Sequence, residues 1–591
     1  MGAWLDRNLE VLARVNPALA RRVRSVRVGE GYQVLPAKNG LPVLRAGKTT
    51  LHSVYDPVRE GEHWARVQEP PLEDAPAVAV LGFGMGYHLP GILKKTGRPL
   101  WVIEPNLEIL RTAMEESDLR ELLSRVLVAT GREEAVMRAL RENRAVTLVH
   151  EPSRNLSPSR YDAIRGRIRL WGLKKLKILV VYPIYGGSLP IADYCSRALR
   201  ELGHHVEEMS YGNAAQLYTA LDMVTTHKEN EAALKGQFTR LLSEMALARC
   251  LEVKPDLVLA LAQAPLLPET LGKIREIGVP LVYWFVEDFR LMEYWKEIAP
   301  LCDLFLTIQK GEFLDAIGAL GVGHAHYLPT AALPEIHRPL TLCPEELREY
   351  GSDLSFVGAG YYNRQQFFQG LLGMEFKIWG SDWNFASPLG RCLQRRGKRV
   401  STEDSVKIFN ATRINLNLHS STYHRGVNPE GDFVNPRTFE IAACGRFQLV
   451  DERAELPDLF EPNLETCTFR DLEELREKTG YYLNHFEEAE RIAGSARERV
   501  LSEHTYASRM EEMLGLMFER GFRGRGDDGE PVEELIARAG AHTELGTYLS
   551  GFQDRKNLRL EDIVSQIHRS QGRLSEQEAM FLLMKELAGN P

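Results

Sequence analysis

The chain has little of what several specialised protein classes require. Its seven cysteines are scattered without a Cys-x-x-Cys pair, which predicts reduced thiols rather than a disulfide framework or a structural zinc site. Lys and Arg number 73 against 81 Asp and Glu, without a long basic block, which disfavours a nucleic-acid partner. No apolar run is long enough to span a bilayer, and the first residues lack the apolar core of a signal peptide. We therefore expect a cytoplasmic protein without a transmembrane segment.

What the chain does have is length and an ordinary globular composition. At 591 residues it exceeds a single hydrophobic core and predicts about three or four domains. Apolar runs typical of buried strands alternate with helical segments, which predicts an α/β protein with parallel sheets. The predicted domains are an N-terminal accessory domain (1–170), two α/β domains (174–335 and 336–520), and a linker with a helical tail (521–591).

Residues 432–450 are the most informative stretch. They predict a polar loop, a short helix from near Pro436 to Gly445 and an apolar strand, because Pro suits a first helical turn and Gly follows helix ends. Asp432 and Glu440 lie on either side of the loop–helix junction. The amides of a helix start favour an anion, and carboxylates accept hydrogen bonds from hydroxyls, as a nucleotide-sugar site requires. An ordinary capped helix packed on a sheet fits the same pattern.

This stretch resembles the acid-x7-Glu signature of retaining GT-B glycosyltransferases. Asp432 and Glu440 fall on the two acidic positions, and Ala443, Cys444 and Gly445 match the small-residue ending. The Asn-Pro-Arg-Thr-Phe-Glu wording resembles more narrowly the CgeB-like (spore-maturation protein) branch. The departure is an Asp where the family has its first Glu, which puts the sugar contact in doubt. Over about residues 175–520, the resemblance implies two facing Rossmann-like domains and retaining, hexosyltransferase-like transfer.

A second glycine turn precedes that stretch and predicts the phosphate contacts. Gly358 and Gly360 follow an apolar strand, and Arg364 lies at the start of the next helix. Glycines admit close backbone approach, and Arg offers a bidentate charged contact, which together suit a pyrophosphate. The predicted donor-binding set is therefore Gly358, Gly360, Arg364, Arg437 and Glu440, with Glu440 on the ribose.

The block before the glycine turn has acids at a predicted strand end. Glu287 and Asp288 follow the apolar run 279–286, and the carboxyl edge of a parallel sheet exposes functional groups. A similar W-x-x-D-D-like element in CgeB-like sequences implies that these acids face the acceptor, whereas a capped helix start at Asp288 fits equally. The predicted catalytic residues are Asp432, Glu440 and Asp288. No D-x-D cluster is evident, so we expect neither a metal nor a cofactor beyond the sugar donor.

In the N-terminal block, the Asn39-Gly40 turn predicts a hairpin. A Gly-x-Gly-x-Gly turn follows between two apolar strands, the second ending at Glu104, an acid in the position that binds ribose hydroxyls. This order is typical of nucleotide-binding units, but Tyr87 replaces the third glycine of the dinucleotide fingerprint, and Val80 stands where methyltransferases usually have an acid. The sequence of this block resembles the N-terminal domain of flagellin-modification (Maf) and pterin-pyrophosphokinase-like proteins. Two interpretations stay open: a ligand site, or a scaffold that docks an acceptor. The polar residues 151–160 are expected to lead out of this unit.

The expected function is transfer of a sugar from a nucleotide sugar to a protein or glycan acceptor, without a metal and with retention. The alternatives are a non-catalytic nucleotide- or glycan-binding assembly protein, or a methyltransferase-like activity in the N-terminal domain. A capping box at Ser575 and Glu578 predicts a helix in the tail, where partner docking is plausible. The sequence does not specify the sugar, the base or the acceptor.

Overall fold

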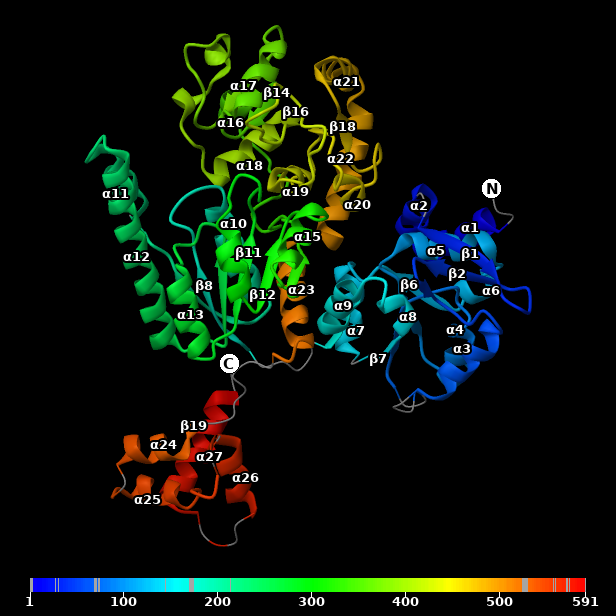
Figure 1. The fold of residues 1–591 in the computed structure, drawn as a ribbon, viewed down its shortest axis with the longest axis vertical. Helices are drawn as coiled ribbons and strands as arrows, with labels where there is room; N and C mark the ends of the chain where they lie inside the picture. Colours follow the sequence, from blue (N-terminus) through cyan, green and yellow to red (C-terminus); the bar gives the residue numbers. More distant parts are fainter. Residues whose placement is uncertain are drawn as a thin grey trace. The chain divides into compact units, whose positions relative to one another are not determined.

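The computed structural model describes residues 4–521, apart from positions 27, 30, 69–71, 73, 74, 144, 170–174 and 213, and residues 522 and 530–589, apart from positions 541, 556, 559, 570, 571 and 573. The predicted boundary at 170–174 and most of the predicted linker after 521 lie outside these residues. The chain forms two compact units, Met1–Gly521 and Phe522–Pro591. The first unit contains three parallel sheets with accompanying helices, which confirms the predicted α/β class (Figure 1).

The first parallel sheet has four strands in the order β6-β5-β4-β7. A small antiparallel sheet, β1-β2-β3, precedes it in the chain. The predicted Asn39-Gly40 turn joins β1 to β2. Residues 151–160, expected to be an exit, instead form α8 and the start of α9. The strands are β1 (Tyr32–Pro36), β2 (Pro42–Ala46), β3 (Thr49–Thr50), β4 (Val78–Leu81), β5 (Leu100–Ile103), β6 (Val126–Ala129) and β7 (Val146–Val149). The helices are α1 (Leu5–Val15), α2 (Pro17–Ser25), α3 (Pro57–Arg66), α4 (Leu89–Lys95), α5 (Leu107–Glu116), α6 (Arg120–Leu123), α7 (Glu134–Glu142), α8 (Glu151–Arg154) and α9 (Pro158–Arg169).

The second sheet has six parallel strands in the order β13-β12-β11-β10-β8-β9. Every residue of β10 and β11 is buried, since helices cover both faces, as expected for parallel sheets. The strands are β8 (Lys177–Val181), β9 (His205–Met209), β10 (Leu257–Leu261), β11 (Leu281–Phe285), β12 (Leu304–Thr307) and β13 (Ala325–Tyr327). The helices are α10 (Ser188–Glu201), α11 (Ala214–Ala220), η1 (Leu221–Met223), α12 (Lys228–Val253), α13 (Pro268–Glu276), α14 (Trp295–Ile298), η2 (Ala299–Leu301) and α15 (Glu312–Ala319).

The third sheet has five parallel strands in the order β15-β14-β16-β17-β18. The strands are β14 (Ser352–Val357), β15 (Phe376–Trp379), β16 (Thr412–Asn417), β17 (Gln448–Asp451) and β18 (Cys467–Phe469). The helices are α16 (Pro344–Tyr350), α17 (Tyr362–Phe367), η3 (Phe368–Leu371), η4 (Pro388–Cys392), η5 (Arg395–Gly397), α18 (Thr402–Ala411), α19 (Pro436–Ala443), α20 (Leu456–Leu459), α21 (Leu472–Asn484), α22 (Phe486–Glu503) and α23 (Tyr506–Glu519).

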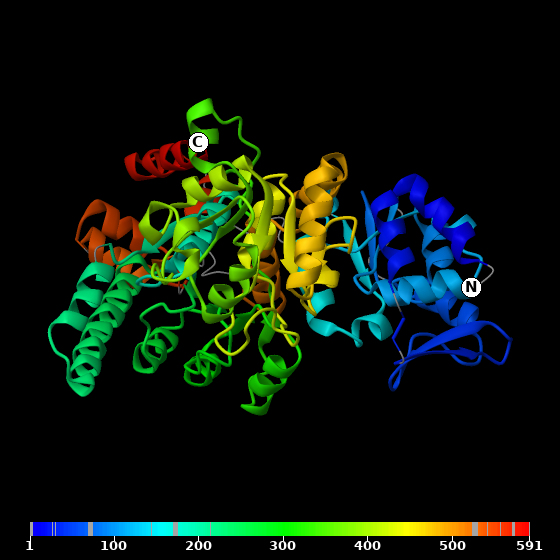
Figure 2. The same ribbon diagram turned by 90° about the horizontal axis from the view of Figure 1, so that it is seen from above.

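The last helices of this unit return from the third sheet to the second. α22 ends at Glu503, and Thr505 then forms a parallel bridge with Ala332. α23 packs against α10, beside the second sheet, and against α9 of the N-terminal part. Figure 2 shows α22 lying between the third-sheet domain and the N-terminal part, where Arg22 pairs with Glu503 (2.9 Å). Two parallel-sheet domains joined by a returning helix form the predicted GT-B architecture.

The second unit is a small helical body with its own apolar core. Its elements are β19 (Glu530–Pro531), α24 (Val532–Ala539), α25 (Glu544–Ser550), β20 (Asn557–Leu558), α26 (Leu560–Arg569) and α27 (Glu576–Gly589). The predicted capping box is present, because Glu578 Oε2 accepts the Ser575 N–H (2.8 Å) and the Ser575 hydroxyl accepts the Glu578 N–H (3.2 Å).

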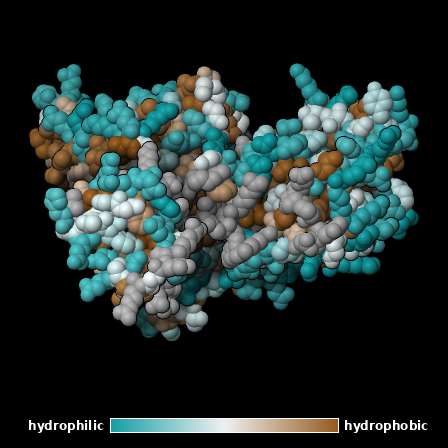
Figure 3. All heavy atoms as spheres, turned by 90° about the horizontal axis from the view of Figure 1, so that it is seen from below, coloured by the Kyte–Doolittle hydropathy of each residue, from teal (hydrophilic) through white to brown (hydrophobic). Residues whose placement is uncertain are grey.

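The face in Figure 3 is largely hydrophilic, with hydrophobic side chains in scattered groups. Among the described helices, none combines the length and the hydropathy that a bilayer span requires.

Candidate functional site

Helix α19 begins at the junction predicted to bind the donor. Asn435 caps it by accepting the Thr438 N–H (3.3 Å), and Pro436 occupies the first turn, as predicted. β14 and β16 are parallel neighbours, so the loops after both strands lie at one sheet edge. Asn363, after the β14 turn, donates to the His419 carbonyl after β16 (2.8 Å). The glycine turn and the helix entrance are therefore linked at the same edge.

A buried polar chain fixes the start of α19. The Asn435 N–H donates to His419 Nε2 (2.8 Å), and His419 Nδ1 donates to Asp451 Oδ1 (2.6 Å). Since Nε2 accepts, the imidazole is neutral with its proton on Nδ1, and burial lowers the pKa of His419 to about 4. Although burial opposes it, the Arg453 guanidinium, 2.6 Å away, holds the pKa of Asp451 below its usual range.

Glu440 lies on the same helix and is only 4% exposed. Its carboxylate contacts the guanidinium of Arg437, one turn earlier, and its Oε1 lies 3.8 Å from His337 Nε2. His337 Nδ1 accepts the Leu333 N–H (3.1 Å), so the ring proton is on Nε2 and faces Glu440. The Arg437 side chain remains 34% exposed. Glu440 is thus a buried acceptor that orients a partly open cation.

Asp432 is held by the second-sheet domain. Its Oδ1 accepts from Gln309 Nε2 (2.9 Å) and its Oδ2 from Arg290 Nη1 (3.1 Å). Gln309 follows β12 and Arg290 follows β11, so both donors lie at the carboxyl edge of that sheet. The same two donors lie 3.5 Å and 3.8 Å from Asp288 Oδ1. The structure therefore brings Asp432 and Asp288 together, whereas Glu440 has a separate set of partners.

Glu287 is a further carboxyl group at this junction. It lies beside Asp288, just after β11. Burial raises the pKa of Glu287 to about 7, and the negative charge of Asp288 acts in the same direction. A carboxyl group that titrates near neutral pH can accept or release a proton under working conditions, which is the property of a general base or acid.

The predicted phosphate turn uses its amides internally. The Gly358 N–H donates to the Trp379 carbonyl and the Gly360 N–H to the Ser381 carbonyl, each at 2.9 Å. A Cβ on Gly360 would lie 2.5 Å from the carbonyl oxygen of Asp382, so only glycine allows the two turns to approach. A Cβ on Gly358 would meet the ring of Phe356 at 2.9 Å, so internal packing accounts for both glycines, and their contact with a pyrophosphate stays a prediction.

Arg364 is buried beneath the same turn. Its Nε donates to the Leu418 carbonyl (2.9 Å) and its Nη1 to the Ala359 carbonyl (3.0 Å), while its guanidinium lies over the rings of Phe356 and Tyr361. Burial lowers its pKa to about 10. In this arrangement Arg364 joins the two loops of the sheet edge, and its role as a phosphate contact stays a prediction.

Arg399 was not predicted but lies between the two domains. Its Nη2 donates to the Gly186 carbonyl (2.9 Å), in the turn that precedes α10 of the second-sheet domain. Burial lowers the pKa of Arg399, and the charge of Arg437 adds to this effect. Arg399 forms no ion pair within the described part of the chain. Arg399 and Arg437 therefore place two cations near the starts of α10 and α19, where an anion is favoured.

The N-terminal glycine turn is arranged differently. Glu104, the predicted ribose ligand, is fully buried and accepts hydrogen bonds from the Phe83 N–H (2.8 Å), the Asn106 N–H (3.0 Å) and the Tyr161 hydroxyl (2.7 Å). The position that would bind a ribose is thus already satisfied by the protein's own donors.

Three buried histidines, His52, His88 and His150, lie beside that turn, and the rings of His88 and His150 are stacked 4.3 Å apart. They are close enough to share a metal ion. However, His52 already uses one nitrogen for the Met85 N–H (3.1 Å) and faces Glu60 with the other (3.3 Å). The histidines therefore act here as packing that fills the space beside the glycines.

Two family models match the chain, and both describe glycosyltransferase-like proteins. The model for "Glycosyl transferase-like" proteins matches residues 364–515, from α17 to α23. The model for the "Glycosyltransferase Maf N-terminal domain" matches residues 30–137, which contain the N-terminal glycine turn. The fold is therefore GT-B, and the chain is similar to glycosyltransferases in its third-sheet domain and to the Maf N-terminal domain in its N-terminal part.

Among curated proteins, the spore protein CgeB of Bacillus subtilis (strain 168) is 27% identical over 264 residues, which cover 43% of this chain and 80% of CgeB. The predicted resemblance to CgeB-like proteins is confirmed.

Several solved structures are similar over more than half of the chain, at low identity. Sucrose-phosphate synthase from Thermosynechococcus elongatus is 12% identical, covering 59% of this chain and 98% of its own, with a TM-score of 0.40. HepE of Anabaena in complex with UDP-glucose is 12% identical, covering 58% and 100%, with a TM-score of 0.41. We draw no functional conclusion from likeness at this level.

Sequence reasoning missed three polar residues of the junction. Gln309 and Arg290 each follow an apolar strand within a few positions, so the strand-end signal that identified Asp288 also applied to them. Arg399 had no such signal, because it lies in an irregular segment after η5 and reaches the second-sheet domain only through the tertiary fold.

Proposed function

We propose that the protein transfers a sugar from a nucleotide-sugar donor to a protein or glycan acceptor. The donor binds at the start of α19, with its diphosphate between Arg399 and Arg437. The acceptor hydroxyl lies at the end of β11, beside Glu287 and Asp288. The matches to glycosyltransferase family models and the similarity to CgeB support this assignment.

The observation that carries the proposal is the set of contacts between the two sheet edges. Asp432 is bonded to Gln309 and Arg290 of the facing domain, and Arg399 reaches back to Gly186. Acids and cations from both domains therefore converge where the carboxyl ends of two parallel sheets face each other. Such edges are where open α/β sheets place ligands.

On the donor side, the reaction separates charge. As the anomeric carbon–oxygen bond breaks, its electron pair remains on the diphosphate, and fixed cations stabilise the charge that develops. Arg399 and Arg437 supply those cations without requiring a metal. Glu440 holds Arg437 in place and accepts a ribose hydroxyl, while Asp432 accepts sugar hydroxyls. Retention of configuration is part of the proposal and rests on the acid-x7-Glu resemblance; it requires the acceptor hydroxyl to attack the oxocarbenium-like carbon from the face that the diphosphate leaves.

On the acceptor side, a hydroxyl oxygen forms the new bond to the anomeric carbon and must lose its proton. Glu287, whose pKa burial raises to about 7, takes that proton. Asp288 shares Gln309 and Arg290 with Asp432, so it ties the acceptor-side acids to the donor loop.

A panel of UDP- and GDP-sugars tested by thermal shift on the full chain examines this proposal. We expect one nucleotide sugar to raise the Tm, and the rise to disappear in Arg437→Ala and Glu440→Ala. The matched control is Arg413→Ala, which removes an arginine at the opposite end of β16, paired with Asp353. If no nucleotide sugar stabilises the protein, or if the control loses the response equally, the donor site is not where we place it.

A non-catalytic binding protein is the second candidate. It is favoured by one observation: both carboxylate oxygens of Asp432 are already bonded by Gln309 and Arg290. To separate the glycosyltransferase from the binding protein, we would measure the release of free sugar from the stabilising donor over hours. Binding of the donor without hydrolysis or transfer would support the binding protein.

A further inference from the structure

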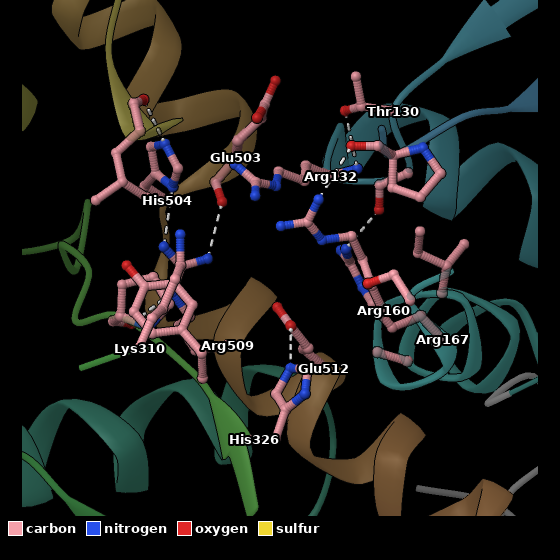
Figure 4. A pocket seen from close by; sticks show the side chains of 18 of the residues that line it. Thr130, Arg132, Arg160, Arg167, Lys310, His326, Glu503, His504, Arg509 and Glu512 are labelled. Carbon is pink, nitrogen blue, oxygen red and sulfur yellow. Dashed lines mark hydrogen bonds and ion pairs between the residues drawn. The ribbon is translucent and has the colours of Figure 1, made fainter. Parts of the chain in front are cut away.

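A cavity of about 260 Å³ lies apart from the junction described above. Pro105 and Thr130 bring to it the ends of β5 and β6, the carboxyl edge of the N-terminal sheet. His326 of β13 and Arg509 of α23 line the opposite side (Figure 4). None of the residues assigned above to donor or acceptor lines it. The cavity therefore occupies the kind of sheet edge at which α/β proteins bind ligands, while the neighbouring glycine turn is filled.

The lining carries far more positive than negative charge. It includes five cationic side chains, Arg132, Arg160, Arg167, Lys310 and Arg509, and two carboxylates, Glu503 and Glu512. Both carboxylates are already engaged. Glu503 pairs through Oε1 with Arg22 and Arg499, and Glu512 pairs with His326, each at 2.9 Å, while Glu503 Oε2 is buried without a hydrogen-bond partner.

Three of the cations have only uncharged partners. Arg132 donates to the Asp458 carbonyl (3.1 Å) and Arg160 to the Pro105 carbonyl (3.4 Å), and Arg509 donates to backbone carbonyls and to His504. In the described part of the chain, none of the three forms an ion pair. The other two cations, Lys310 and Arg167, have carboxylate partners outside the lining.

This arrangement is unfavourable without a counter-ion. Burial lowers the pKa of Arg160 and the charge of Arg132 lowers it further, while the carboxylates of Asp458 and Glu512 act in the opposite direction. Burial also lowers the pKa of Arg509 to about 10. The Nε of Arg167 is buried without a hydrogen-bond partner. The cavity lining thus carries more positive than negative charge, and its cations are buried or partly buried, so a bound anion would stabilise this region.

We propose that this cavity binds a phosphate-bearing small molecule of about the size of a sugar phosphate. Guanidinium groups match phosphate oxygens through paired N–H donors, and Figure 4 shows Arg132 and Arg160 facing the same space as Arg509. The volume lies just below the range of about 300–1,000 Å³ for typical ligand pockets, which fits one small ligand rather than a whole nucleotide sugar. The apolar Leu314, Ile164 and Tyr327 also line the cavity and suit the carbon face of a sugar.

Calorimetric titration of the full chain with inorganic phosphate, glucose 6-phosphate and glucose tests the proposal. We expect glucose 6-phosphate to bind, inorganic phosphate to bind more weakly and glucose to give no signal. Arg160→Gln and Arg132→Gln should each weaken glucose 6-phosphate by about tenfold or more. The matched control is Arg138→Gln, because Arg138 is exposed on the neighbouring α7 and pairs only with Glu134.

The Tm of the ligand-free variant distinguishes a loss of binding from misfolding. Because Arg160 forms no ion pair among the described residues, Arg160→Gln should leave the Tm of the ligand-free protein close to that of the wild type. Arg437→Ala separates this site from the proposed donor site, since it should leave glucose 6-phosphate binding unchanged. Loss of binding in Arg437→Ala or in Arg138→Gln, or failure of glucose 6-phosphate to bind the wild type, would overturn the proposal.

Discussion

Glycine-rich turns follow β4 in the N-terminal sheet and β14 in the third sheet. The two sheet edges differ in the side chains that surround these turns. At the N-terminal edge, Glu104 is fully buried and bonded to its own surroundings, and a Cβ on Gly84 would meet His52 Nε2 at 2.6 Å. At the β14–β16 edge, Asp432 and Arg437 keep 21% and 34% of their side chains exposed. Both turns need glycine, but Glu104 beside the N-terminal glycines is covered, whereas Asp432 and Arg437 stay partly open toward a facing domain.

The comparison shows that a glycine pattern predicts backbone geometry and not the presence of a ligand. Whether a site stays open depends on side chains that arrive from elsewhere in the fold. At the first edge these are the buried histidines His52, His88 and His150. At the second edge they are Arg290 and Gln309 from the opposite sheet, which hold Asp432 without covering it.

The largest expected effect comes from removing a cation at the β14–β16 edge, which is the proposed donor site. We predict that Arg437→Ala lowers kcat for sugar transfer by about 10²- to 10³-fold, because one fixed donor to developing charge contributes about that much. Steady-state kinetics with the stabilising donor measures it. Glu104→Gln, at the filled edge, should leave kcat unchanged in whatever fraction folds; an equal loss in both variants would remove the distinction between the edges.

The second effect concerns the acceptor side of the open edge. Since burial raises the pKa of Glu287 to about 7, activity should rise as pH passes through that value and the carboxylate forms. Glu287→Gln should lower kcat by about 100-fold and abolish this rise. A pH–kcat profile measures both. A rise that persists in the variant would assign the titration to another group.

The third effect tests how the N-terminal part is attached. A Cβ on Gly166 of α9 would lie 2.2 Å from the carbonyl oxygen of Gly515 on α23, so Gly166→Ala forces two helices apart. We expect a loss of about 1–3 kcal/mol in the free energy of unfolding, measured by denaturant titration. Gly272→Ala, in α13, is the control, because a Cβ there would meet no described neighbour within 4 Å. Equal changes in both would mean that the α9–α23 contact is loose.

The smallest effect is a pH dependence of the free energy of unfolding that arises from His88, beside the N-terminal glycine turn. Burial lowers the pKa of His88 to about 3, below the value near 6.5 of the unfolded chain. The unfolded state therefore binds the proton more readily, and stability falls as pH drops from 6.5 toward 3, by up to about 1.4 kcal/mol per pH unit. Unfolding free energies of the wild type and His88→Gln across this range measure it. A slope that does not change in the variant would contradict the assignment.

Much of the fold was predictable from local patterns. The Pro and Gly signals placed α19 within two residues of its end, and the Asn39-Gly40 turn identified the first hairpin. The strand after α19 is displaced by one residue, to Gln448–Asp451, because its first position depends on pairing with β16. α9 was missed, since its sequence is rich in arginine and shows little apolar periodicity.

The site was less predictable because it depends on tertiary contacts. Sequence spacing placed Asp432 and Glu440 near the same helix start, yet their side chains have different partners. The sequence correctly placed Arg364 at the start of the helix after the glycine turn. It did not indicate that the Arg364 guanidinium would be buried against backbone carbonyls. Arg399 comes from an irregular segment that has no sequence signal at all.

The most direct measurement is a structure of the protein with bound UDP or GDP, whichever raises the Tm. The account predicts the diphosphate within hydrogen-bond distance of the guanidinium groups of Arg399 and Arg437, and a ribose hydroxyl on Glu440. A nucleotide bound instead over the N-terminal glycines, with its ribose on Glu104, would contradict it.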